Sequence, residues 1–180
     1  MKRIRNYIPK IILLDTTILV LMYVVLFFIL DIFDLAFRKW VLFLFLLVAA
    51  AGLIVGVIQL LLKIEKKTLK YTLICIFVAL AVTIGIATIP ITIFAFANDE
   101  HIVELDNVKY VAYVDGWMQT YVHYYEYKGP FVEGNTERIK EYYGKGGFDP
   151  IGSEYTYPVI QTTYYDEDGN IISVIDGDQP

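Results

Sequence analysis

Three long apolar stretches restrict what this chain can fold into more than any other feature. They cover residues 11–33, 40–62 and 71–97 of the 180, and the second and third contain no charged side chain. About 20 apolar residues in helical conformation cross the hydrocarbon core of a bilayer. Lipid offers no hydrogen-bond partner to open backbone groups, so each stretch is predicted to be a transmembrane α-helix.

The charged residues divide the chain at the end of the third stretch. Residues 1–97 contain 10 Lys and Arg and 4 Asp and Glu, whereas residues 98–180 contain 5 and 16, so the net charges are +6 and −11. Twelve of the 15 tyrosines follow residue 97. Halves that differ this much indicate two kinds of domain. We expect a three-helix transmembrane anchor in residues 1–97 and a separate acidic domain in residues 98–180.

The basic residues outside the apolar stretches indicate how the anchor is oriented. The segments on one side of the predicted membrane hold eight of them, namely Lys2, Arg3, Arg5, Lys10, Lys63, Lys66, Lys67 and Lys70. The flanking segments on the opposite side hold three, namely Arg38, Lys39 and Lys109. Cytoplasmic loops carry the excess of Lys and Arg. The distribution predicts a multi-pass cell-membrane protein with a cytoplasmic N-terminus and an extracytoplasmic C-terminal domain.

The cysteine content indicates a bacterial cell. Cys75 is the only cysteine and lies inside an apolar stretch, so the acidic domain contains no disulfide, whereas small eukaryotic surface domains usually depend on them. No small-x-small cleavage site follows the first stretch, so we expect that stretch to remain as an anchor rather than act as a signal peptide. A second alternative is cleavage after Ala97, because Ala95 and Ala97 have the small-x-small form.

Two features inside the predicted helices mark packing positions. Gly52 and Gly56 form a GxxxG pattern, which lets another helix backbone approach closely. We expect them to pack against a helix of the same chain, and a homodimer seam is the alternative. Ionisable residues inside membranes are often functional, but Asp15 lies near the predicted cytoplasmic boundary, at a depth similar to that of Gln59. We favour a structural contact of Asp15 with Gln59 or Lys63 over an ion path.

The acidic domain begins with a strong hairpin signal. Asp115 and Gly116 separate two β-type segments, and an Asp-Gly pair favours a two-residue hairpin turn. Such a turn places Val114 opposite Trp117 and Tyr110 opposite Tyr121. The predicted register puts Tyr110, Trp117, Tyr121, His123, Tyr125 and Tyr127 on one face, and Val111, Tyr113, Met118, Val122 and Tyr124 on the other. Both faces are partly apolar, so we expect the sheet either to be covered on both sides or to lean on something.

The rest of the acidic domain predicts a second hairpin and a short helix. The hairpin is expected over residues 155–175 with its turn at residues 166–170, and residues 102–105 are expected to add an edge strand. Residues 135–144 indicate a short helix, with Asn135 as its N-cap and Gly144 at its end. The predicted fold class is therefore three transmembrane helices followed by a small β-rich (α+β) domain.

The sequence shows no pattern typical of an enzyme or a metal site. There is no HExxH or cysteine-pair motif, no GxSxG elbow and no glycine-rich phosphate loop. Asp166, Asp168 and Asn170 have the spacing that begins a calcium loop, but Ile171 and Gly177 stand where that loop needs Gly and Glu. We expect a hairpin turn there. We further expect no enzymatic activity, metal or cofactor, and no nucleic acid among the partners.

Clustered aromatic side chains are well suited to protein contact. We therefore expect a membrane-anchored extracytoplasmic binding or protective module, of the immunity or sensor kind, which contacts a peptide or protein at the outer membrane face. Trp117, Tyr121, His123 and Tyr125 are the expected contact surface. The alternative is an accessory or structural subunit of a larger membrane complex that docks through its transmembrane helices. Lipid and one protein or peptide are thus the expected partners, with a homo-oligomer through the glycine seam as the alternative.

Overall fold

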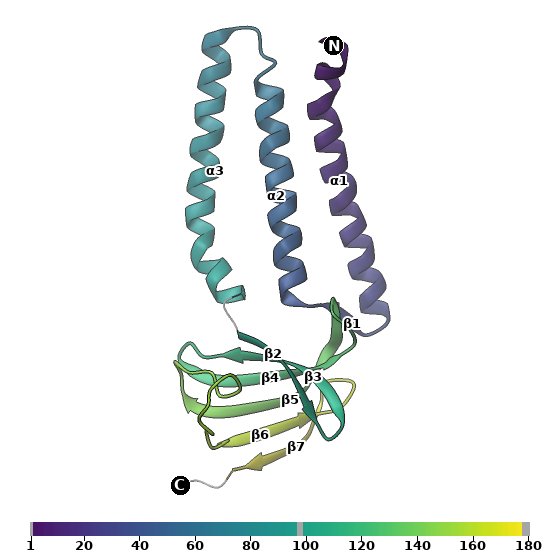
Figure 1. The fold of residues 1–180 in the computed structure, drawn as a ribbon, viewed down its shortest axis with the longest axis vertical. Helices are drawn as coiled ribbons and strands as arrows, with labels where there is room; N and C mark the ends of the chain where they lie inside the picture. Colours follow the sequence, from purple (N-terminus) through teal and green to yellow (C-terminus); the bar gives the residue numbers. More distant parts are fainter. Residues whose placement is uncertain (1, 97–98, 178–180) are drawn as a thin grey trace. The chain divides into compact units, whose positions relative to one another are not determined.

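The computed structural model describes residues 2–96 and 99–177 and shows three helices and seven strands in that part of the chain (Figure 1). In chain order these are α1 (Lys2–Ile32), β1 (Leu35–Phe37), α2 (Lys39–Leu61), α3 (Lys67–Phe96), β2 (Asp99–Leu105), β3 (Val108–Asp115), β4 (Gln119–Tyr127), β5 (Val132–Lys145), β6 (Gln161–Tyr165) and β7 (Ile171–Asp176). The chain divides into two compact units. The helical unit takes in Met1–Phe28 and Lys39–Phe96, and the β-unit takes in Ile29–Arg38 and Ala97–Pro180.

The helical unit confirms the prediction of three apolar helices. Pro9–Ile32, Lys39–Leu61 and Lys67–Thr92 are each long and apolar enough to span a membrane, with mean hydropathies of 2.6, 3.1 and 2.6. Their large aliphatic and aromatic side chains are mostly exposed in the structure, as lipid-facing side chains must be. A multi-pass membrane protein follows from these helices. The cleavage site considered after Ala97 lies outside the described residues.

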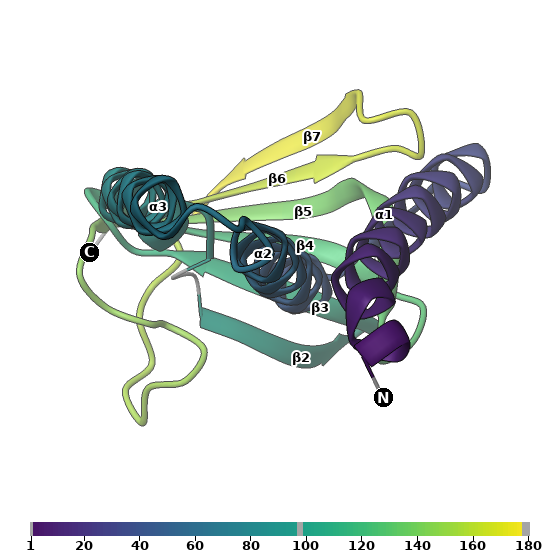
Figure 2. The same ribbon diagram turned by 90° about the horizontal axis from the view of Figure 1, so that it is seen from above.

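The β-unit is one antiparallel sheet with the strand order β2-β3-β4-β5-β6-β7 (Figure 2). β5 is its longest strand, with 14 residues. β4 pairs along one side of β5, whereas β1 and β6 pair with different parts of the other side. β1 lies between α1 and α2 in the sequence, so the chain contributes to this sheet once before α2 and again after α3.

The predicted short helix is wrong, because residues 135–144 form most of β5. Glu, Arg and Lys in this segment suit a helix, but local propensity is weaker than tertiary pairing. Ile139 pairs with Tyr124 on β4 and with Tyr164 on β6, so the strand is held on both sides. The backbone N–H of Asn135, the expected helix cap, donates instead to the Asp34 carbonyl oxygen at 2.9 Å.

The first hairpin is present, but its predicted two-residue turn is wrong. Val114 pairs with Val122 instead of Trp117, and residues 116–120 separate the last paired residues of the two strands, Asp115 and Tyr121. A type I′ turn needs a positive φ at both central residues, and neither Asp115 nor Gly116 has one. The two-residue turn lies one hairpin earlier, where Asp106 and Asn107 have φ of 51° and 65° between paired Leu105 and Val108.

Long-range hydrogen bonds explain the wider loop. The Gly116 carbonyl oxygen accepts from the Gly147 N–H at 2.6 Å, and the Met118 carbonyl oxygen accepts from the Gly146 N–H at 3.0 Å. The loop therefore uses backbone groups from a distant segment, which no local turn pattern contains. Gly147 has a φ of 97°, a conformation that favours glycine.

The observed register of β4 against β3 differs from the predicted register by five residues. Because side chains alternate along a strand and five is an odd number, the side chains of β4 lie on the face opposite to the predicted one. Ala112, Val114, Val122 and Tyr124 form the buried core, with Ile139, Tyr143 and Ile151 packed against it. Tyr110 shares this face through its pairing with Glu126, so its predicted place beside Tyr121 is wrong. Val111 and Tyr113 are buried on the other face, so both faces of β3 are covered, as expected.

The remaining β predictions are confirmed in outline. β6 and β7 form the second hairpin, with the turn at residues 166–170 and a φ of 81° at Gly169. Its first strand begins at Gln161, later than predicted. β2 forms the expected edge strand and extends from Asp99 to Leu105.

Candidate binding surfaces

Three of the four predicted contact residues lie on one face of β4. Tyr121, His123 and Tyr125 alternate along the strand, and each is half-buried. The ring centroids of Tyr121 and His123 are 6.2 Å apart. Trp117 lies in the loop before β4, where 67% of its surface is exposed. The structure thus places three of these residues in one row and Trp117 outside the strand.

Side chains of β5 fix the positions of this aromatic row. The Tyr121 ring stacks on Tyr142 with a centroid distance of 4.9 Å, and Lys140 Nζ lies 4.7 Å from the Tyr121 ring centroid. His123 Nδ1 lies 2.7 Å from Glu137 Oε1. Stacking and cation–π contacts of this kind each contribute about 0.5–1 kcal/mol at exposed sites. The row is therefore a preorganised surface.

The deeper end of the row contains a buried tyrosine–glutamate pair. The Tyr113 hydroxyl donates to Glu133 Oε2 at 2.6 Å, and the exposed fractions of the two residues are 1% and 6%. Tyr125 packs edge-on against Tyr113, with 5.9 Å between ring centroids. Burial, together with the charges of Glu137 and Glu133, raises the pKa of Tyr125 to about 12. Its hydroxyl is therefore protonated at neutral pH.

Arg38 is a buried residue of the β-unit whose structural role sequence reasoning missed. Its Nη1 donates to the Pro130 carbonyl oxygen at 3.1 Å, and its backbone N–H donates to the Phe131 carbonyl oxygen at 3.1 Å. Its Nη2 forms an ion pair with Glu100 on β2, and its guanidinium lies 5.7 Å from the Tyr127 ring centroid. In the sequence, Arg38 stands out only as one of the basic residues that indicate orientation.

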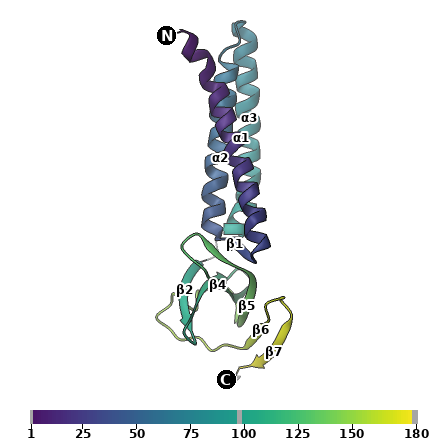
Figure 3. The same cartoon turned by 90° about the vertical axis from the view of Figure 1, so that its right-hand side faces the viewer.

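The Arg38–Glu100 pair shows how strongly the sheet curls. β1 pairs with β5, and three strands separate it from β2 in the sheet, yet the residue after β1 reaches β2. Figure 3 shows the strands following an arc. Glu100 pairs with Tyr113, so the ion pair closes over the face that carries Tyr113 and the aromatic row. The buried Nε of Arg38 has no hydrogen-bond partner among the described residues.

The opposite face of the sheet carries two further polar clusters. Glu141 Oε2 accepts from the Tyr124 hydroxyl at 2.5 Å and from the Tyr143 hydroxyl at 2.8 Å. Burial and the Glu141 carboxylate raise the pKa of both tyrosines above the usual range. His101 Nε2 lies 2.7 Å from Asp149 Oδ2, while Asp149 Oδ1 accepts from two backbone N–H groups. The first cluster joins β4 to β5, and the second joins β2 to the segment after β5.

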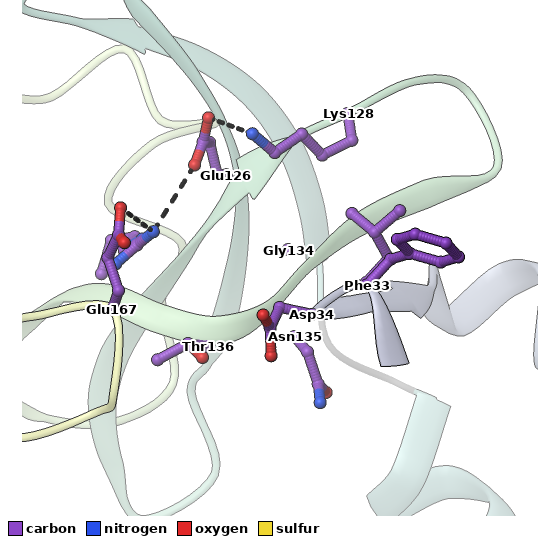
Figure 4. Close-up of a pocket in the computed structure, with 10 residues that line it drawn as sticks. Phe33, Asp34, Glu126, Lys128, Gly134, Asn135, Thr136 and Glu167 are labelled. Atoms are coloured by element: carbon purple, nitrogen blue, oxygen red, sulfur yellow. Dashed lines mark hydrogen bonds and ion pairs between the residues drawn. The ribbon is translucent and has the colours of Figure 1, made fainter. Parts of the chain in front are cut away.

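A polar cavity of about 310 Å³ lies where β1 meets β5 (Figure 4). It is lined by Phe33, Asp34, Leu35, Glu126, Lys128, Gly134, Asn135, Thr136, Arg138 and Glu167. Arg138 Nη2 lies 3.8 Å from Glu126 Oε2 and 3.6 Å from Glu167 Oε1, and Lys128 pairs with Glu126. Asp34 has a φ of 53°, which is uncommon outside glycine. The lining offers donors and acceptors of both charges, which suits a polar group.

The glycines of the second helix face the first helix of the same chain. A Cβ at Gly52 would overlap Thr16 Oγ1, and a Cβ at Gly56 would lie 2.6 Å from Leu13 Cδ2. Nearby, the Tyr23 and Phe45 rings stack with a centroid distance of 3.9 Å.

The polar residues of the same two helices differ in exposure, since Asp15 is exposed and Gln59 is half-buried. A contact between Asp15 and Gln59 or Lys63 stays a prediction.

The acidic turn before β7 is held by its own backbone. Asp166 Oδ1 accepts from the Asp168 and Asn170 N–H groups at 2.9 and 2.8 Å. Within residues 2–96 and 99–177, no group of three or more His, Cys, Asp or Glu side chains is arranged to hold a metal ion. Comparison of the chain with protein-family models, curated proteins and solved structures finds no match.

Proposed function

We propose that this protein is a membrane-anchored binding module whose β-unit contacts a peptide or protein on the extracytoplasmic side. The observation that carries the proposal is the exposure of large apolar side chains on an otherwise acidic unit. Trp117 and Met118 are exposed in the β3–β4 loop, Phe131 is exposed between β4 and β5, and four aliphatic residues are exposed on β7. Exposed apolar patches on soluble surfaces mark interaction sites.

The connectivity of the β-unit supports its location on one side of a membrane. Residues 29–38 comprise the end of α1 and the segment that connects it to α2, and residues 99–177 follow α3, yet both segments belong to the same unit. If α2 and α3 each cross the bilayer, the chain leaves this side and returns to it. The eight basic residues at the N-terminus and between α2 and α3 then lie on the opposite side, which the positive-inside rule assigns to the cytoplasm.

The alternative, a subunit that docks through its transmembrane helices, has less support. Its sequence basis was the Gly52 and Gly56 seam, and in the structure Thr16 and Leu13 of the same chain occupy that seam. Close approach of helix backbones at small residues is satisfied by this packing within the chain. We therefore do not propose helix docking as the function.

Thiol labelling of whole cells tests the orientation on which the proposal depends. Cysteine is placed at Asp168 or at Lys66 in a Cys75→Ala background, because both side chains are exposed and lie on opposite sides in the proposed topology. An impermeant maleimide should label Asp168→Cys in intact cells and both variants after permeabilisation. Labelling of Lys66→Cys but not Asp168→Cys in intact cells would reverse the orientation and overturn the proposed function.

A further inference from the structure

The last strand of the sheet is an unusually apolar edge. Among the described residues β7 pairs with β6 alone, so its other edge has no strand beside it. Ile171, Ile172, Val174 and Ile175 are each at least 50% exposed. Val174 and Ile175 are consecutive in the regularly paired part of β7, so their side chains lie on opposite faces of the sheet. The edge thus presents apolar side chains above and below a row of open backbone groups.

Natural sheets usually protect such an edge with Lys, Pro, a bulge or inward-pointing charges. β2, the edge at the other end of the sheet, carries Asp99, Glu100 and Glu104, and Glu100 is engaged by Arg38. β7 has no charged residue or proline from Ile171 to Ile175, and its one register shift lies between Ile171 and Ser173, so that Ser173–Asp176 remain in regular register with β6. The two edges of the same sheet therefore differ, and only β7 keeps the features of a template for another strand.

The charges at the ends of β7 indicate what kind of strand fits there. Asp166, Glu167 and Asp168 precede β7, and Asp176 ends it. Hydrogen bonds from the Asn170 amide and side chain lower the pKa of Asp166 below its usual value. Arg138, 3.6 Å from Glu167, is the basic group paired with this turn in the structure. The edge is therefore apolar in its middle and acidic at both ends.

A second copy of this chain does not suit that charge pattern. In an antiparallel β7–β7 pair, the acidic turn of one copy approaches Asp176 of the other, and a parallel pair places identical acidic ends side by side. Like charges that face each other across a strand pair are destabilising. A lipid surface does not suit it either, because hydrocarbon leaves the open backbone groups of the edge unpaired.

We propose that the outer edge of β7 binds an extended protein segment that has an apolar centre and Lys or Arg at its ends. The segment adds one strand to the sheet, its backbone pairs with β7, and its basic ends lie beside Asp166–Asp168 and Asp176. Main-chain hydrogen bonds supply affinity in such strand addition, and the alternating side chains supply specificity. This inference rests on the proposed binding function and assigns to it a site and a partner chemistry.

The test uses the full chain in detergent micelles and a fluorescent synthetic peptide with a six-residue Val and Thr centre flanked by two Lys at each end. Two control peptides are identical except for one property: one has Glu in place of Lys, and one carries N-methyl groups on alternate central amides. Anisotropy should show saturable binding of the Lys-ended peptide. Binding of both control peptides should be at least about tenfold weaker, because each lacks one component of the fit.

Matched serine substitutions on the two sheet edges locate the site. Ile172→Ser on β7 should weaken peptide binding by about tenfold, because the removed side chain is buried only in the complex. Ile102→Ser on β2 starts from a similarly exposed Ile and should leave binding unchanged. Melting curves of both variants should match the wild type, and Val174→Thr, which keeps the side-chain shape, should weaken binding in the same direction.

Several outcomes would overturn this inference while leaving the labelling result intact. Equal binding of the N-methylated peptide would show apolar adsorption instead of strand addition. Equal losses for Ile102→Ser and Ile172→Ser would place the site elsewhere, and absence of saturable binding would reject the edge. Sedimentation completes the test, because a wild-type dimer that Ile172→Ser abolishes would make a second copy the occupant. If the labelling experiment instead shows the reversed orientation, the proposed function is overturned, but the binding of a strand at the edge of β7 is not.

Discussion

Strands β3 and β7 are both rich in β-branched and apolar residues, yet one is the most buried strand of the β-unit and the other is largely exposed. Val111, Ala112, Tyr113 and Val114 are consecutive and all buried, with exposures of 4% or less, whereas every aliphatic residue of β7 is exposed. In the part of the chain that the structure describes, β3 has a neighbouring strand on each side, and β7 has only β6. Position in the strand order therefore decides burial here, and composition does not.

The cover over the two faces of β3 comes from distant parts of the chain. On one face Ile151 and Tyr143 pack against the core. On the other, Arg38 reaches across to Glu100, which pairs with Tyr113. β7 has no comparable partner among the described residues. The comparison predicts that substitutions near β3 cost much stability and that substitutions on β7 cost little.

Tyr124→Ala should have the largest effect. Tyr124 is 4% exposed, meets Tyr110 edge-on at 6.3 Å and donates to Glu141. Removing a buried aromatic side chain leaves a cavity and should lower the free energy of unfolding by about 3–5 kcal/mol. Denaturant unfolding followed by the near-ultraviolet signal of the tyrosines measures the change. A loss below about 1 kcal/mol would mean that this face is not the core.

Arg38→Ala should come next, at about 3 kcal/mol. It removes one partner of a buried ion pair and leaves Glu100 without its cation, and such losses are typically about 3–5 kcal/mol. We expect the lower end of this energy range because 19% of the Glu100 side-chain surface remains exposed to solvent. The same denaturant measurement applies, with Lys39→Ala, the adjacent basic residue, as the control. Equal effects of the two substitutions would contradict a specific role of Arg38.

Asp149→Asn should cost about 1 kcal/mol at neutral pH, because it weakens hydrogen bonds to a charged acceptor that is partly exposed. Partial burial raises the pKa of Asp149, but hydrogen bonds from Gly152, Ile151 and His101 outweigh this, so the pKa is lower than the usual 3.8. A carboxylate with a lowered folded-state pKa stabilises the fold above its unfolded-state pKa. That contribution is lost as the pH falls through the folded-state value.

Stability measured from pH 6 to pH 2, a range chosen to extend about two units to either side of an ordinary carboxyl pKa, checks this linkage. The difference between the wild type and Asp149→Asn should be constant above about pH 5 and should shrink below it. A difference that instead grows on acidification would contradict the sign of the shift. Asp115→Asn, on an exposed carboxyl at the end of β3, serves as the control.

Val174→Ala should have the smallest effect, within about 0.5 kcal/mol, because exposed positions away from specific contacts tolerate substitution. The identical change at Val122, which has an exposure of 0%, should cost about 2 kcal/mol from lost burial and the cavity left behind. Because the two substitutions delete the same atoms, the difference between their stability losses reports only the different environments of Val174 and Val122. Similar losses at both positions would mean that β7 is covered in the folded protein.

The structure also separates two hairpins that look alike in sequence. The turn at residues 166–170 lies where it was predicted, and its hydrogen bonds are made within the turn, by Asp166 and Asn170. The Asp115–Gly116 pair is the stronger turn signal by residue type, yet the register that it predicts is wrong by five residues. The loop there is completed by Gly146 and Gly147, which are far away in the sequence.

Sequence alone was sufficient for the features that depend on solvent and local chemistry. The three apolar helices, the division of charge near residue 97 and the last hairpin all follow from the residues inside each element, because transfer to lipid and turn closure are local or additive. The aromatic row on β4 was likewise expected, since alternation along a strand needs no knowledge of its neighbours.

Only the tertiary structure decided the rest. β1 is three residues long, too short for any periodic signal, and forms because β5 pairs with it. Residues 135–144 are a strand because β4 and β6 flank them. Arg38 is buried because the sheet curls and brings Glu100 to it. Each of these depends on pairing between segments far apart in the chain, and a strand gains its hydrogen bonds from partners that its own sequence does not contain.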